Sequence, residues 1–135
     1  MMQTLEQKRA QHALNKVKQI ERDYVEEKQE MFVSYVENLP SMILTNGFGQ
    51  AVAMLLAQAR GDRSDAHYLL YSCLEEWLCR DEPQAPYRAE NDLMAAIVNC
   101  DRGTYLRAQA EALAWLEWMK KFAVAFLKNP GSIGR

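Results

Sequence analysis

The sequence predicts an all-α fold, a single compact bundle of about six helices. Apolar residues recur at three- and four-residue spacing over most of the 135 residues, which is the period of an amphipathic helix. Capping residues precede several of these stretches, and no alternating run of β-branched residues indicates a strand. We expect one helical domain over residues 1–135, with about 129–135 forming a short flexible tail.

The first predicted helix opens with a capping box, in which Thr4 and Gln7 satisfy the first backbone N–H groups. Its apolar side is one continuous stripe. The residues of that stripe are Ala10, Ala13, Leu14, Val17, Ile20 and Tyr24. This spacing is typical of a helix that buries one side and exposes the other.

A second helix is expected over about 28–39. Its inward residues are predicted to be Met31, Phe32, Tyr35, Val36 and Leu39. Pro40 is expected to end it, because proline lacks an N–H and its ring clashes with the preceding turn. The third helix then begins near Pro40 or near Gly47 and ends at Gly61. Asn46 and Gly47 tolerate the left-handed backbone that such a junction needs.

Three more helices are predicted in the second half of the chain. Their expected bounds are about 65–79, 89–99 and 102–128. Ser64 and Asp101 can cap the first and the last of them, and the sequence Asn-Pro-Gly at 129–131 stops the last. Residues 80–87 contain two prolines and are expected to form an exposed loop.

Composition excludes several classes of protein. No apolar run approaches the ~20 residues needed to cross a bilayer, and the polar segment 1–8 lacks the apolar core of a secretory signal. The three cysteines, Cys73, Cys79 and Cys100, are odd in number and lack CxxC spacing, which suits reduced thiols. We therefore expect a soluble, cytoplasmic protein without membrane contact.

The formal net charge is only −2, but the chain is basic at both ends and acidic between them. In the first helix the basic residues lie opposite the apolar stripe, with few acids among them. These residues are Lys8, Arg9, His12, Lys16, Lys18 and Arg22. Such a surface is either an ordinary solvated face or a track that binds phosphates and releases their counterions.

The last helix is apolar over most of its circumference, which is typical of a central core helix or of one partly covered by another chain. Lys121 and Lys128 lie on its narrow polar strip, and Glu117 can pair with Lys121 one turn away. The candidate RNA-contacting residues are therefore Lys8, Arg9, Lys16, Lys18 and Arg22, with Lys121 and Lys128 as weaker candidates.

The sequence contains no recognisable catalytic or cofactor motif. The Gly-Phe-Gly at 47–49 lacks the third glycine of a dinucleotide fingerprint, and no P-loop sequence is present. His67, Cys73 and Cys79 are spaced too widely for a zinc knuckle. Neither histidine stands beside a plausible nucleophile. We expect no enzymatic activity, no cofactor and no metal.

Three segments of the chain carry a resemblance to a known family. They are residues 4–10, residues 35–56 with the sequence ILTNGFGQA, and residues 104–122. In order and overall length they resemble the small subunit of Cmr complexes, the type III-B CRISPR RNA-guided ribonucleoprotein effectors. The middle segment is the most specific of the three.

The resemblance implies a non-catalytic, all-helical subunit that functions in antiviral defence. Several copies would stack head to tail along the belly of the complex and help to hold target RNA against the guide RNA. The implied partners are other Cmr subunits, further copies of the same chain and the guide–target duplex. The alternative is a free-standing helical adaptor or regulator that binds only proteins, and salt-dependent binding to an RNA duplex would distinguish the two.

Overall fold

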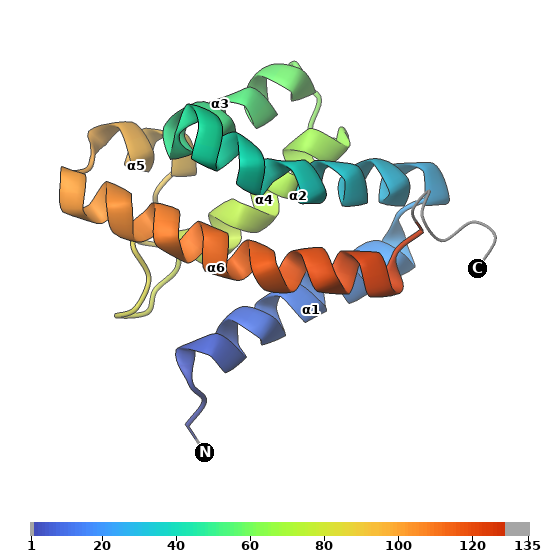
Figure 1. The fold of residues 1–135 in the computed structure, drawn as a ribbon, viewed down its shortest axis with the longest axis horizontal. Helices are drawn as coiled ribbons and strands as arrows, with labels where there is room; N and C mark the ends of the chain where they lie inside the picture. Colours follow the sequence, from blue (N-terminus) through green and yellow to red (C-terminus); the bar gives the residue numbers. More distant parts are fainter. Residues whose placement is uncertain (1, 129–135) are drawn as a thin grey trace.

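The computed structural model describes residues 2–128, within which six α-helices are joined mostly by short connections (Figure 1). The helices are α1 (Leu5–Asp23), α2 (Glu26–Asn46), α3 (Phe48–Ala59), α4 (Ala66–Leu78), α5 (Leu93–Asn99) and α6 (Arg102–Phe126). The β-pairing in this part of the chain is an isolated bridge between Cys79 and Tyr87. The predicted all-α bundle is confirmed.

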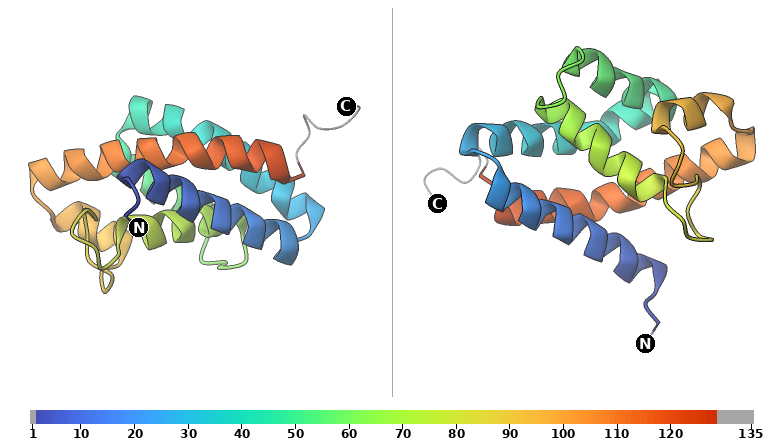
Figure 2. Two further views of the ribbon diagram at one scale, coloured as in Figure 1. Left: turned by 90° about the horizontal axis from the view of Figure 1, so that it is seen from below. Right: turned by 180° about the vertical axis from the view of Figure 1, so that it is seen from behind.

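The long helix α6 crosses the whole molecule, with α1 along one side of it and α2 along the other (Figure 1). From behind, α4 occupies the centre, and α3 and α5 cover the end where α6 begins (Figure 2). Later residues of α1 contact later residues of α6. The pairs, in order along both helices, are Arg9–Glu111, His12–Trp115 and Lys18–Phe126. The two helices therefore run in the same direction.

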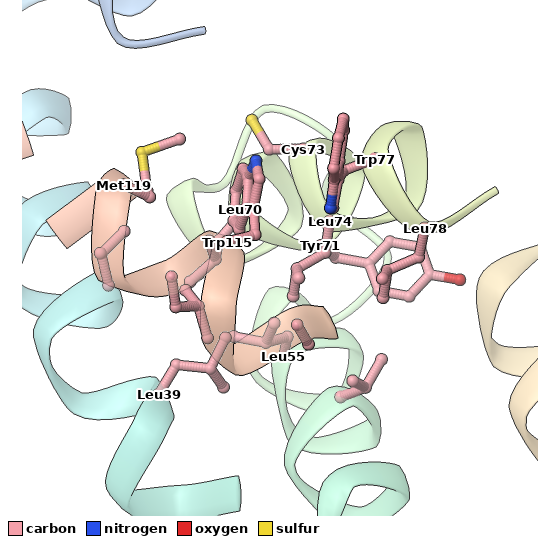
Figure 3. Close-up of a cluster of buried hydrophobic side chains, with 14 of the residues drawn as sticks. Leu39, Leu55, Leu70, Tyr71, Cys73, Leu74, Trp77, Leu78, Trp115 and Met119 are labelled. Atoms are coloured by element: carbon pink, nitrogen blue, oxygen red, sulfur yellow. The ribbon is translucent and has the colours of Figure 1, made fainter. Parts of the chain in front are cut away.

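The core lies where α4 and α6 face each other and α2 and α3 close over them (Figure 3). Trp115 and Met119 of α6 are fully buried there, beside Leu74 and Trp77 of α4. Leu39 enters from α2. This burial confirms the central-core interpretation for the middle of α6, whereas Leu106, Val124 and Phe126 near its two ends remain exposed.

The prediction that Pro40 ends the second helix is wrong. Pro40 lies inside α2, which begins at Glu26 and continues to Asn46. Proline forfeits one hydrogen bond at a cost of roughly 3 kcal/mol in a helix interior. The apolar stripe nevertheless continues across it, because Val36, Leu39 and Ile43 are all buried. The packing of this stripe outweighs the local preference of proline for a helix end. Met31, which was expected to point inward, is instead 40% exposed.

Gly47 alone separates α2 from α3. Its N–H donates to the carbonyl of Ile43 and its own carbonyl accepts from the N–H of Ala51, so one residue ends one helix and begins the next. Its backbone angles, φ 93° and ψ 154°, belong to a region that essentially only glycine occupies. The expected helix start near Gly47, rather than near Pro40, is therefore the correct alternative.

We expect Gly47→Ala to lower the free energy of unfolding by about 1–3 kcal/mol, because any side chain is strained at this φ. Urea unfolding followed by circular dichroism measures the change. Gly103→Ala is the control, since Gly103 lies in the first turn of α6, where an added Cβ makes only an ordinary contact. That control should be neutral or stabilising by about 0.5 kcal/mol. Equal stability of the two variants would contradict the prediction.

Other boundaries differ from expectation for local reasons. The cap of α4 is Asp65, because the Ser64 hydroxyl bonds to Asp62 instead. The fifth helix begins at Leu93, capped by Asp92, so the connection before it is longer than predicted. Within that connection Tyr87 is buried rather than exposed. The caps at Thr4 and Asp101 are as predicted.

The sixth helix ends at Phe126, two residues before the expected bound. The proposed stop at 129–131 and the tail over 129–135 lie outside the described residues. Among residues 2–128 no helix is long and apolar enough to cross a membrane.

Candidate nucleic-acid interface

Lys8, Arg9 and Lys16 of α1 are paired with carboxylates from elsewhere in the fold. Lys8 Nζ lies 3.1 Å from Glu82 Oε2, in the connection before α5. Lys16 Nζ lies 2.6 Å from Glu76 Oε2, on α4. Both acids belong to the acidic middle of the sequence, which the fold lays against α1. Their negative charge offsets the positive charge that the sequence predicted for this surface.

Arg9 forms the most buried ion pair on α1. Its Nε and Nη2 donate to the two carboxylate oxygens of Glu111, at 2.5 and 2.9 Å. The same carboxylate accepts a hydrogen bond from the indole of Trp77 at 3.0 Å. The hydrogen bond to Glu111 raises the pKa of Arg9 above its ordinary value. Arg9 therefore joins α1 to α6 and α4, which is a structural role.

The remaining candidates are more exposed, and the carboxylates that pair with Lys18, Arg22 and Lys121 are close to them in sequence. The side chains of Lys18, Arg22 and Lys121 are 48%, 71% and 67% exposed. They pair respectively with Glu21, Asp23 and Glu117, each at most four residues away along the chain. Exposed pairs of this kind contribute little energy and are screened by salt, so they can exchange for a phosphate at low cost.

These exposed cations lie toward the same end of the molecule. Lys18 Nζ stands 3.8 Å from the centre of the Phe126 ring, which brings the end of α1 to the end of α6. Lys121 lies five residues before Phe126, about 8 Å along the axis. Lys128 lies two residues after the end of α6 and is also exposed. We call Lys18, Arg22, Lys121 and Lys128 the terminal cation group.

Comparison with known proteins identifies the family of this chain. The family model described as CRISPR-associated protein, Cas_Cmr5, matches residues 5–126. The chain belongs to the Cmr5 family. It is also similar to a crystal structure of a CRISPR-associated Cmr5 family protein from Thermus thermophilus, with a TM-score of 0.72 and 29% sequence identity. That match covers 93% of this chain and 99% of the other, and it confirms the assignment to the Cmr small-subunit family.

Sequence reasoning missed the carboxylates that hold the basic side of α1 in this Cmr5 family protein. One of them left a signal. Glu111 interrupts the buried stripe of α6, between Ala108 and Trp115, where an unpaired charge would be costly. A charged residue at such a position requires a partner, and the facing helix supplies Arg9. Glu76 and Glu82 left no comparable signal, because both lie on surfaces that are partly exposed.

No group of three or more histidine, cysteine or acidic side chains lies close enough to hold a metal ion within residues 2–128. His67, Cys73 and Cys79, which the sequence placed too far apart for a zinc knuckle, have other surroundings. His67 stacks on Tyr35 with the ring centres 3.7 Å apart and contacts Asp65. Burial raises the pKa of both Cys73 and Cys79 to about 12, so these thiols stay protonated near neutral pH.

Proposed function

We propose that this protein is a non-catalytic structural subunit of a type III-B CRISPR Cmr effector complex. Several copies stack along the complex and help to hold target RNA against the guide RNA in antiviral defence. The observation that carries the proposal is the Cmr5 family match over residues 5–126. In this proposal the protein acts with other Cmr subunits and needs no cofactor of its own.

The distribution of exposed apolar side chains supports stacking. One group lies where α2 ends and α6 begins, and comprises Leu44, Val98 and Leu106. A second group lies where α2 begins and α6 ends, and comprises Val25, Met31, Val124 and Phe126. Leu106 and Phe126 are 20 residues apart on one helix, about 30 Å. We call these groups the first and second apolar ends.

Two different apolar surfaces at opposite ends of a molecule suit head-to-tail contact, which continues as an open filament rather than closing into a pair. The first apolar end is also unusually poor in charge. No charged residue occurs over 38–59 or over 93–100. Depletion of charge is typical of the buried centre of a protein interface.

The charge arrangement supports RNA contact that depends on assembly. Carboxylates of this chain pair with Lys8, Arg9 and Lys16, and the net charge is −2, so we expect the isolated subunit to bind RNA only weakly. The terminal cation group is able to exchange its weak local pairs for phosphates. Neighbouring subunits would complete the binding channel. Contacts of this kind position RNA without reading its sequence.

The alternative is a helical adaptor that binds only proteins. The same three paired cations favour it, because the basic side of α1 then serves to attach α1 to its own fold. The two proposals differ in whether RNA accompanies the protein in its complex. They also differ in whether salt weakens binding to an RNA duplex.

Purification of the tagged protein from cells that encode it tests the function. We expect guide RNA and the other Cmr subunits to co-purify, with more than one copy of this chain per guide RNA by native mass spectrometry. Leu44→Glu with Val98→Glu should lower that copy number, because each change buries a charge in the stack. Gln11→Glu with Ser34→Glu is the control, since both residues are exposed and polar and lie outside 38–59 and 93–100. Recovery of the protein without RNA would favour the adaptor instead.

A further inference from the structure

His12 lies on the inner side of α1, where the centre of its imidazole is 5.3 Å from the ring centre of Trp77 and 5.9 Å from that of Trp115. Figure 3 labels these two tryptophans. The Trp115 indole donates from Nε1 to His12 Nδ1 at 3.0 Å. An indole nitrogen can only donate, so Nδ1 must be the acceptor and the ring proton must reside on Nε2. The hydrogen bond therefore requires a neutral imidazole.

Protonation would break this arrangement. A charged imidazole carries a hydrogen on both ring nitrogens, which sets two donors against each other at the contact with Trp115. Trp115 is fully buried, so its indole N–H would find no water to replace the lost acceptor. Either the charged ring or the helix that carries it must move away.

The charged groups around His12 come from three elements. Glu76 Oε1 of α4 lies 3.3 Å from His12 Nε2 and favours the charged form, but its other oxygen binds Lys16 of α1 at 2.6 Å. Arg80, stacked on Trp77 after the end of α4, disfavours a second positive charge. From α6 the facing group is the neutral indole of Trp115. Burial is the largest influence and lowers the pKa of His12 below its ordinary 6.5.

The contacts of His12 matter most for the first half of α1. The fully buried apolar anchors of the helix, Ala13, Val17 and Ile20, all follow His12. The part before it is held by polar contacts, chiefly those of Lys8 and Arg9. Figure 1 shows this part of α1 reaching away from the body of the bundle.

We propose that His12 is a proton-sensitive latch that holds the first half of α1 against α4 and α6, so that acidification loosens this segment before the rest of the fold. The latch concerns the attachment of α1 and stands whether or not α1 contacts RNA. The pKa of His12 is about 6.5 in the unfolded chain and lower in the folded chain. At pH values between these two pKa values, the unfolded chain binds more protons than the folded chain. The stabilisation of the first half of α1 by His12 is therefore complete above pH 6.5, and it is lost as the pH falls through the pKa of His12 in the folded chain.

Native-state amide hydrogen exchange of the whole chain tests the latch at about pH 7.5 and about pH 5.5, with rates corrected for the intrinsic effect of pH. We expect protection over 8–12 of α1 to fall at the lower pH relative to protection over 32–39 of α2. His12→Asn should abolish that difference, because the Asn Oδ1 can replace Nδ1 as an acceptor and does not titrate. The proposal would be overturned if the lower pH reduced protection over 8–12 equally in the His12→Asn variant, or if it caused no selective loss of protection there in the wild type.

Two further measurements keep the test decisive if His12→Asn folds poorly. Nitrogen-15 NMR of the wild-type ring should show the tautomer with hydrogen on Nε2 and a pKa below 6.5. Hydrogen on Nδ1, or a pKa at or above 6.5, would overturn the latch. Trp115→Phe removes the donor but keeps an aromatic ring, so the selective loss of protection in α1 should shrink. Its persistence at full size would likewise overturn the latch.

Discussion

Replacement of Glu111 by alanine should lower the free energy of unfolding by about 3 kcal/mol, the largest effect expected of any single charge in the described chain. The Glu111 side chain is only 8% exposed and accepts from both Arg9 and Trp77. Its loss leaves the partly buried Arg9 guanidinium without its hydrogen-bonded carboxylate and the buried Trp77 indole N–H without an acceptor. Urea unfolding at neutral pH measures the change.

Glu117→Ala is the matched control, since it removes an exposed carboxylate from the same helix. Glu117 pairs only with exposed Lys121, so the expected loss is below about 0.5 kcal/mol. The double variant Arg9→Met with Glu111→Leu should recover much of the stability lost in Glu111→Ala, because two apolar side chains leave no unpaired charge. A loss in Glu111→Ala no larger than in the control would show that the buried pair is not what attaches α1.

The fold was largely predictable because its main signals are local. The apolar stripe and the capping box of α1 lie within about 20 residues of each other, and Asp101 caps α6 through the N–H of Thr104, three residues later. The prediction failed at Pro40, where the decisive fact is not local. Val36, Leu39 and Ile43 carry the helix across the proline because α4 and α6 pack against that stripe.

The candidate interface was predictable only in part for the same reason. A helical projection of α1 finds the basic residues but contains no information on what faces them. The partners of Lys8 and Arg9 lie 74 and 102 residues further along the chain. His12 shows most clearly what a helical projection cannot predict. Its position in α1 suggested an exposed cation, whereas its neighbours are two core tryptophans.

Neutralising the terminal cation group should weaken binding of target RNA by the assembled complex and lower its dependence on salt. The variant replaces Lys18, Arg22, Lys121 and Lys128 with glutamine, which keeps much of the side-chain length and removes four charges. Removal of each cation that binds a phosphate should reduce the slope of log affinity against log salt by about one, so the slope should fall by up to about four. Filter binding at several salt concentrations measures it.

The matched control removes four exposed arginines outside this group, Arg60, Arg63, Arg88 and Arg102, also as glutamine. Both variants carry the same net charge, so a general electrostatic effect would change them equally. We expect the control to keep the wild-type slope to within about one, and the terminal-group variant to lose affinity by a similar factor for unrelated target sequences. If the two variants bind alike, the terminal cation group is a solvated surface, and the adaptor function becomes the better account of this protein.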